Sequence, residues 1–167
     1  RGGPIVSLVI GEALQAKRFF STGTPKARGS SFDLTIGTIF NHEGKIVDGP
    51  FTLQPGHMVQ VVSAEVFRLP DSITGHVTYK TGLTRKGIWA LTVGIVDPGW
   101  TGPIATTLLN FSRVDFSISA GDPFLRVSFF DHGPVPKTAL SENTDSQTYL
   151  RDVQKIAMTK FPQTFLN

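Results

Sequence analysis

Residues 93–102 read VGIVDPGWTG, a short apolar run that ends abruptly in a turn. Asp-Pro-Gly is a strong turn signal, and the run before it has the length and composition of a strand. An Asp at this position commonly hydrogen-bonds its own backbone, so Asp97 has a plain interpretation as a turn cap. The same carboxylate also lies between an apolar strand and Trp100, a position from which it can take part in chemistry.

The alternation of short apolar runs and turns continues over most of the chain. Turn residues separate the runs, as in HEGK, QPGH, LPDS and SAGDP. The runs are LTIGTIF, FTL, MVQVVSAEVFRL, GHVTY, IWALTVGIV, IATTLLNFS, VDFSIS and FLRVSFFDH. Many short strands at this spacing, together with 17 glycines and 11 prolines, predict an all-β sandwich, jelly roll or closed barrel.

Both ends of the chain carry a helical pattern instead. Between 7 and 20 the apolar residues recur at loosely helical spacing: Leu8, Ile10, Ala13, Leu14 and Phe19. This predicts a short amphipathic helix that plugs one end of the sheet. Between 145 and 160 one helical face carries Tyr149, Val153, Ile156 and Ala157 behind a Ser/Asp-rich start. This predicts a terminal helix packed on the sheet or on a neighbouring subunit.

Length and composition set the remaining bounds. The 167 residues, 40% of them apolar, fit a single domain over 1–167 with a core over 30–131 and a helical tail over 141–167. There is no cysteine, which excludes disulfides and thiolate zinc sites. No apolar run approaches the roughly 20 residues of a membrane span and no signal-peptide pattern is recognisable, so we expect a cytoplasmic protein without membrane contact. A net charge of +3 without a basic stripe disfavours duplex nucleic acid and suits a small polyanion such as a triphosphate.

Four stretches resemble, in order and with suitable gaps, the motifs of the dCTP deaminase and dUTPase superfamily. They are SSFDLTIG (30–37), YKTGLTRKGI (79–88), TVGIVDPGWTG (92–102) and AGDPFLRVSFF (120–130). The likeness covers about residues 7 to 131 and is closer to the deaminase branch. It implies a distorted jelly-roll or β-barrel fold of the dUTPase-like type, with a short N-terminal helix and a C-terminal helix. It also implies a homotrimer whose active sites lie between subunits.

The resemblance assigns roles to individual residues. Asp97 corresponds to the carboxylate beside the attacking water, and Trp100 to the aromatic beneath the deoxyribose. Arg85 falls on the catalytic arginine of the deaminases, and Lys80, Thr81 and Gly82 on the phosphate-binding stretch. The simpler alternatives are a partly buried core aromatic for Trp100 and a Thr-Gly turn with two solvated cations for the basic stretch.

Several positions depart from the family pattern. Thr107 stands where the deaminases have their general acid/base Glu. Val93, directly before the hairpin glycine Gly94, replaces a base-facing Asn of the dUTPases, and Arg126 replaces the Gln of the fourth motif. The tail that closes over the triphosphate in the family is not recognisable after His132. Asp33 of the first motif is expected to be mainly structural.

Two functions are consistent with these residues. One is a (deoxy)pyrimidine nucleoside triphosphate hydrolase in which Asp97 activates water and ordinary deamination is disfavoured by Thr107. The alternative is a non-catalytic trimeric nucleotide-binding or structural module. The four histidines show no metal-ligand spacing, so any Mg²⁺ is expected to arrive with the triphosphate rather than on protein ligands.

Overall fold

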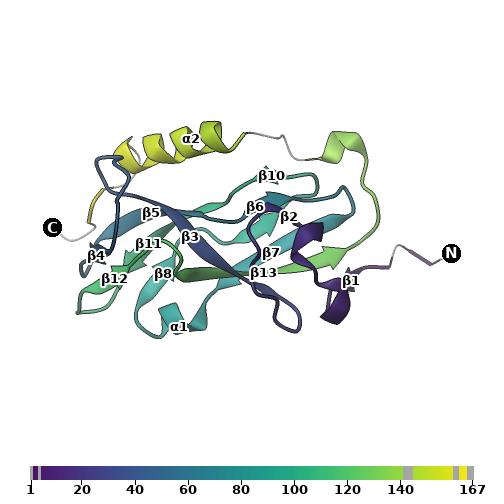
Figure 1. The fold of residues 1–167 in the computed structure, drawn as a ribbon, viewed down its shortest axis with the longest axis horizontal. Coiled ribbons are helices and arrows are strands. Elements are labelled where there is room, and N and C mark those ends of the chain that lie inside the picture. The colour runs from purple at the N-terminus through teal and green to yellow at the C-terminus, as the bar shows by residue number, and fades with distance from the viewer. Residues whose placement is uncertain (1, 4, 141–144, 160–161, 165–167) are drawn as a thin grey trace.

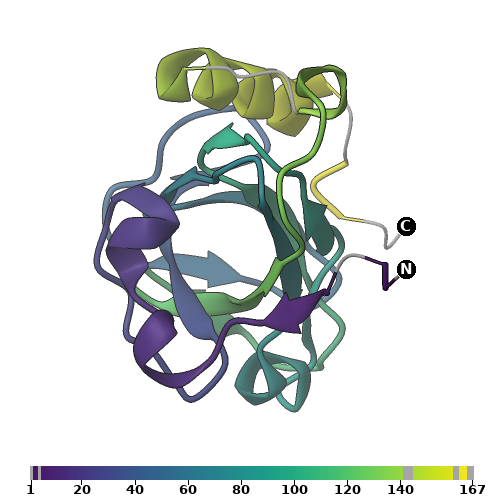
Figure 2. The same cartoon turned by 90° about the vertical axis from the view of Figure 1, so that its right-hand side faces the viewer.

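The computed structural model describes the whole chain except residues 1, 4, 141–144, 160–161 and 165–167. Its main feature is a curled eight-stranded sheet with the path β8-β11-β5-β3-β13-β7-β9, to which β1 adds at β13. These strands are β1 (Ser7–Leu8), β3 (Phe32–Phe40), β5 (Met58–Ser63), β7 (Ile73–Tyr79), β8 (Ile88–Ala90), β9 (Gly94–Val96), β11 (Ala105–Asn110) and β13 (Pro123–Asp131). All their pairings are antiparallel, and Figure 2 shows the strands curling into a barrel.

Two smaller sheets complete the barrel. One has the order β10 (Thr101–Gly102), β6 (Val66–Arg68), β2 (Phe20–Thr22), and the other pairs β12 (Phe116–Ile118) with β4 (Phe51–Leu53). The short helix α1 (Thr81–Thr84) and the longer helix α2 (Ser146–Thr159) lie on opposite sides of the barrel in both views (Figures 1 and 2). The all-β fold predicted from the strand and turn pattern is therefore confirmed.

Aromatic side chains fill one end of the core. Phe19 stacks on Phe129 with ring centroids 4.0 Å apart, and Phe20 packs edge-on against Phe32 at 5.5 Å. Phe32 of β3 and Phe129 of β13 point inward because side chains in a strand point to opposite faces in turn, whereas Phe19 and Phe20 come from the end of η2 and the start of β2. The alternation in β3 and β13 thus supplies part of this aromatic core, and the segment before β3 supplies the rest.

The prediction of one amphipathic helix over residues 7–20 is wrong. The segment contains β1 and two single-turn 3₁₀ helices, η1 (Gly11–Ala13) and η2 (Ala16–Arg18), before β2 begins. Gly11 adopts a φ of +57°, which interrupts a continuous helix, and the Val9 N–H donates to the Phe129 carbonyl at 2.8 Å. Strand pairing and burial of Phe19 outweigh the loose helical spacing.

The predicted C-terminal helix is present as α2. Asp145 caps it by accepting hydrogen bonds from the Thr148 N–H at 2.9 Å and the Thr148 hydroxyl at 2.7 Å. Val153 and Ala157 are buried in a cluster with Phe40 and Val62, so in this chain the helix packs on its own sheet. Residues 141–144 of the predicted tail lie outside the described residues. In the described part of the chain no helix is long and apolar enough to cross a membrane.

Candidate functional site

The turn after β9 leaves the Asp97 carboxylate free. The Trp100 N–H donates to the Asp97 carbonyl at 3.1 Å, Pro98 takes the second position, and Gly99 has a φ of +80° at the third. This is the arrangement of a type II turn, which needs a residue tolerant of positive φ at that place. Asp97 is exposed, and its carboxylate accepts no hydrogen bond from any described residue. The turn is closed by the backbone, so the side chain is not used as a cap.

Asp97 borders a hollow of about 250 Å³ with an aromatic wall. Its lining residues are Ile95, Val96, Asp97, Trp100, Ile104 and Tyr149. The Trp100 indole N–H donates to the carbonyls of Gly102 at 3.2 Å and Pro103 at 3.3 Å. Because that polar group is satisfied internally, Trp100 offers only its ring to the hollow.

The predicted phosphate-binding residues lie elsewhere in the chain. Lys80 directly precedes α1, while Thr81, Gly82 and Arg85 are exposed on or just after it. Lys80 and Gly82 border a second hollow of about 440 Å³ that shares no lining residue with the Asp97 hollow. Figure 1 shows α1 across the barrel from β10 and α2. The structure therefore does not bring Asp97 and the basic stretch together within one chain.

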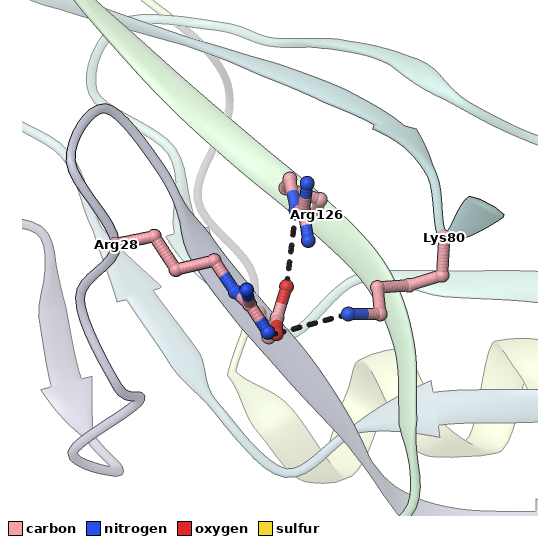
Figure 3. A network of polar contacts seen from close by, with 4 residues as sticks. Arg28, Lys80 and Arg126 are labelled. Atoms are coloured by element: carbon pink, nitrogen blue, oxygen red, sulfur yellow. Dashed lines mark hydrogen bonds and ion pairs between the residues drawn. The ribbon is translucent and has the colours of Figure 1, made fainter. Parts of the chain in front are cut away.

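Three cations converge on Asp33 (Figure 3). Its carboxylate contacts Lys80 Nζ at 2.9 Å, Arg28 Nη2 at 2.8 Å and Arg126 Nε at 3.1 Å. The strand register explains part of this cluster, because Asp33 of β3 and Arg126 of β13 are paired residues. The cluster agrees with the structural role expected for Asp33, and it ties up two predicted nucleotide-binding residues, Lys80 and Arg126.

Asp33 stays ionised in this cluster, and the cluster as a whole carries a net positive charge. Burial raises the pKa of Asp33, but hydrogen bonds from Lys80, Arg28 and Arg126 outweigh burial and hold that pKa below its ordinary value. One carboxylate against three cations leaves an excess of two positive charges. Sequence reasoning missed Arg28, whose only signal was an arginine five residues before the Asp of the first motif.

Thr107 is enclosed rather than poised for proton transfer. It lies on β11 with 3% of its surface exposed, and its hydroxyl accepts a hydrogen bond from the Gln60 side-chain amide. Both groups satisfy each other in the interior, which is the normal state of buried polar side chains. No titratable group occupies the Thr107 position, so the arrangement offers no acid or base there.

Val93 and Gly94 are half-buried at the start of β9. They border a hollow of about 170 Å³ together with Thr92 and Tyr149. Gly94 pairs with Val77 of β7. An apolar side chain at 93 presents no hydrogen-bonding group to a base, in contrast to an Asn.

No group of three or more His, Asp or Glu side chains suited to a metal ion occurs among the described residues. His132 is engaged instead with the Thr74 hydroxyl at 2.8 Å. Mg²⁺ prefers oxygen ligands in octahedral geometry, and the carboxylate of Asp33 is already occupied by three cations.

A sequence model of the family described as dCTP deaminase-like matches residues 17–132. The chain belongs to the dCTP deaminase-like family. This dCTP deaminase-like chain is 27% identical over 125 residues to the dCTP deaminase of Pyrococcus horikoshii, a match that covers 72% of this chain and 80% of that protein. It is 37% identical over 124 residues to the dUMP-forming dCTP deaminase of Dictyoglomus thermophilum, covering 60% of this chain and 64% of that protein.

Solved structures agree on the fold of this dCTP deaminase-like chain. The 2'-deoxycytidine 5'-triphosphate deaminase of Agrobacterium tumefaciens matches with a TM-score of 0.55 and 15% identity, over 63% of this chain and 40% of that one. The EIAV dUTPase matches with a TM-score of 0.50 and 17% identity, over 84% of this chain and 100% of that one. These likenesses confirm the predicted dUTPase-like barrel.

Proposed function

We propose that this chain binds a pyrimidine deoxyribonucleoside triphosphate and hydrolyses it with release of pyrophosphate, Asp97 taking a proton from the attacking water. The supporting observation is that Asp97 presents an unpaired, exposed carboxylate to a hollow walled by Trp100. General base catalysis by such a group contributes about 10²–10⁴ in rate. Relatives named as dCTP deaminases, one of them dUMP-forming, support the class of substrate.

The site is proposed to form between two copies of the chain. Lys80, Thr81, Gly82, Arg85 and Arg126 supply cations, a hydroxyl and a glycine N–H suited to phosphate oxygens. In one chain α1 lies across the barrel from β10 and α2 (Figure 1), and the hollow beside Lys80 and Gly82 shares no lining residue with the Asp97 hollow, so we take a single copy to offer only half of the site. A closed homotrimeric ring, with the basic set of one copy facing the Asp97 hollow of the next, would complete it.

The proposed reaction is hydrolysis rather than deamination. A deaminating site needs a group that shuttles protons to the leaving amine, and an alcohol such as Thr107 does not do this near neutral pH. The hydroxyl of Thr107 is also engaged by Gln60 in the interior. We therefore expect pyrophosphate without ammonia.

Mg²⁺ would take part only as a companion of the triphosphate. Phosphate and water oxygens are its expected ligands, and no step above depends on it. A dUTPase of phage phi11 is described as coordinating a structural Mg(II) ion, but at 12% identity that likeness concerns the fold alone.

A second candidate function is nucleotide binding without turnover. It is favoured by the ion pairs that Asp33 makes with Lys80 and Arg126, since these reduce the charge left for phosphates. It is also favoured by the absence of a titratable group at 107.

The test is a screen of dCTP, dUTP and dTTP for released pyrophosphate and ammonia, with thermal-shift binding in parallel. We expect pyrophosphate from at least one nucleotide, and loss of that activity in Asp97→Asn with binding retained. Asp48→Asn, at an exposed Asp that lines none of the described hollows, is the matched control. Full turnover in Asp97→Asn rejects the role of Asp97, and binding without turnover in the wild type selects the second function.

A further inference from the structure

Tyr149, in the first turn of α2, borders three neighbouring hollows. The first is the hollow of about 250 Å³ that Asp97 lines. The second is the hollow of about 170 Å³ that Val93 and Gly94 line. The third hollow, of about 330 Å³, is lined in part by Gln60 and Thr107. Adjacent hollows share further lining residues, Ile95, Val96 and Ile104 between the first two, and Thr92 and Ala105 between the last two. They therefore form one row beneath the start of α2.

The ring of Tyr149 is held in place from several directions. It packs edge-to-face on Trp100 with centroids 5.8 Å apart. Its backbone N–H donates to the Asp145 carbonyl at 3.0 Å, within the capped first turn. Burial raises the pKa of the Tyr149 phenol while a backbone hydrogen bond from Ala105 lowers it, with burial the larger effect, so the ring stays neutral.

The helix that carries Tyr149 is itself fixed to the barrel. Val153 and Ala157 are buried against the sheet, and the Gln154 amide donates to the Gly44 carbonyl at 2.8 Å. The ring is thus positioned by the fold before any ligand arrives, which lowers the ordering cost of binding.

The lining of the row indicates which part of a ligand it would take. Its only charged lining residues are acidic, Asp97 in the first hollow and Asp152 in the third. Carboxylates repel phosphates, so the row favours an uncharged part of the ligand over the triphosphate chain, whose attacked phosphate would reach it only at the Asp97 end. Apolar and aromatic surface with a few hydroxyl and amide groups suits an uncharged flat ring with a sugar.

We infer that Tyr149 is a specificity-determining wall of the nucleoside site, so that the base of the nucleotide packs against the Tyr149 ring beside Trp100. The inference rests on the proposed function and assigns to α2, predicted only as a packing helix, a part in the site. The triphosphate would extend away from the row toward the basic set of the neighbouring copy.

The experiment compares the affinities of two probes, a non-hydrolysable dUTP or dCTP analogue and inorganic tripolyphosphate, for wild type and variants. Stacking of a base on an aromatic side chain is strong enough that Tyr149→Ala should weaken analogue binding by about tenfold. Tripolyphosphate has no ring, so its affinity should not change. Tyr149→Phe keeps the ring and should bind the analogue as the wild type does. Gln147→Ala, exposed in the same turn, is the control.

A purely structural role for Tyr149 would weaken both probes together, and an obstructing role would strengthen analogue binding in Tyr149→Ala; either result overturns the inference. If Tyr149→Ala does not fold, Tyr149→Leu keeps an apolar side chain without a flat ring and should show the same selective loss. If the wild type binds no nucleotide at all, the proposed function fails first. If it binds and Tyr149→Ala binds equally well, only the inference about Tyr149 fails.

Discussion

Replacing Asp33 by Asn should destabilise the barrel measurably, because one carboxylate holds together three cations from separate parts of the chain. The Arg28 and Arg126 side chains are 53% and 34% exposed, and ion pairs at such positions contribute at most about 1 kcal/mol each. The Lys80 side chain is only 14% exposed, so its ammonium would be left largely desolvated without a counter-charge, at a cost of about 1–3 kcal/mol. Asn retains one acceptor oxygen and the shape of the side chain.

The net loss in unfolding free energy should be about 2–3 kcal/mol near neutral pH. For a domain of this size that corresponds to a fall of about 4–12 °C in melting temperature. Thermal denaturation followed by circular dichroism, at one protein concentration, measures it. Asp48→Asn removes an exposed carboxylate and should leave the melting temperature unchanged.

The pH dependence of the stability difference between wild type and Asp33→Asn tests the role of the carboxylate more directly. The pKa of Asp33 in the folded protein lies below its ordinary value of 3.8, so this carboxylate stabilises the fold at any pH above that value. The stabilisation is lost as the pH falls through the folded-state pKa, and the gap between wild type and Asp33→Asn should close there. Equal stability near neutral pH, or a gap that persists well below 3.8, would refute the reasoning.

Three further substitutions test the architecture around the site. Gly99→Ala forces a side chain onto a φ of +80° with its Cβ 3.2 Å from Leu140, and should lower the unfolding free energy by about 1–3 kcal/mol in urea denaturation. Asp145→Ala removes the cap of α2 and should cost about 1 kcal/mol, seen as faster hydrogen exchange confined to that helix; uniform acceleration would contradict it. Phe129→Ala removes a fully buried ring and should cost about 3–5 kcal/mol, whereas a small change would mean that the core can collapse around the gap.

The strands could be predicted because their cause is local. Runs such as FDLTIGTIF alternate buried and more exposed residues, and turn residues mark their ends. The N-terminal segment was predicted wrongly because Leu8, Ala13 and Phe19 match a loose helical spacing. The segment instead pairs as β1 with β13, which lies far along the chain. The spacing of apolar residues within one segment carries no information about a strand with which that segment pairs elsewhere in the chain.

The parts of the site that sequence reasoning missed are products of tertiary contacts. Arg28, which was not predicted, meets Lys80 and Arg126, which were, only because β3, β13 and the end of β7 lie side by side in the sheet. Tyr149 shares a helical face with the buried Val153, and periodicity alone does not distinguish a residue that fills a core from one that walls a hollow. The resemblance to a family supplied Asp97 and Arg85 as candidates and implied a site shared between subunits, and the structure keeps the Asp97 hollow and the one beside α1 apart within one chain.

The division of the proposed site between copies can be measured by complementation. Asp97→Asn and Arg85→Ala should each abolish nucleotide hydrolysis, because each removes one half of every site; Arg85 is exposed and makes no ion pair with a described residue, so its loss should not affect folding. Co-expressed at equal levels, the two variants should assemble rings in which about a quarter of the sites combine an intact Asp97 with an intact Arg85 from the next copy, and should regain about a quarter of the wild-type rate. Mixed rings with no activity above the separate variants would contradict a site shared between copies, and with it the account given of Asp97.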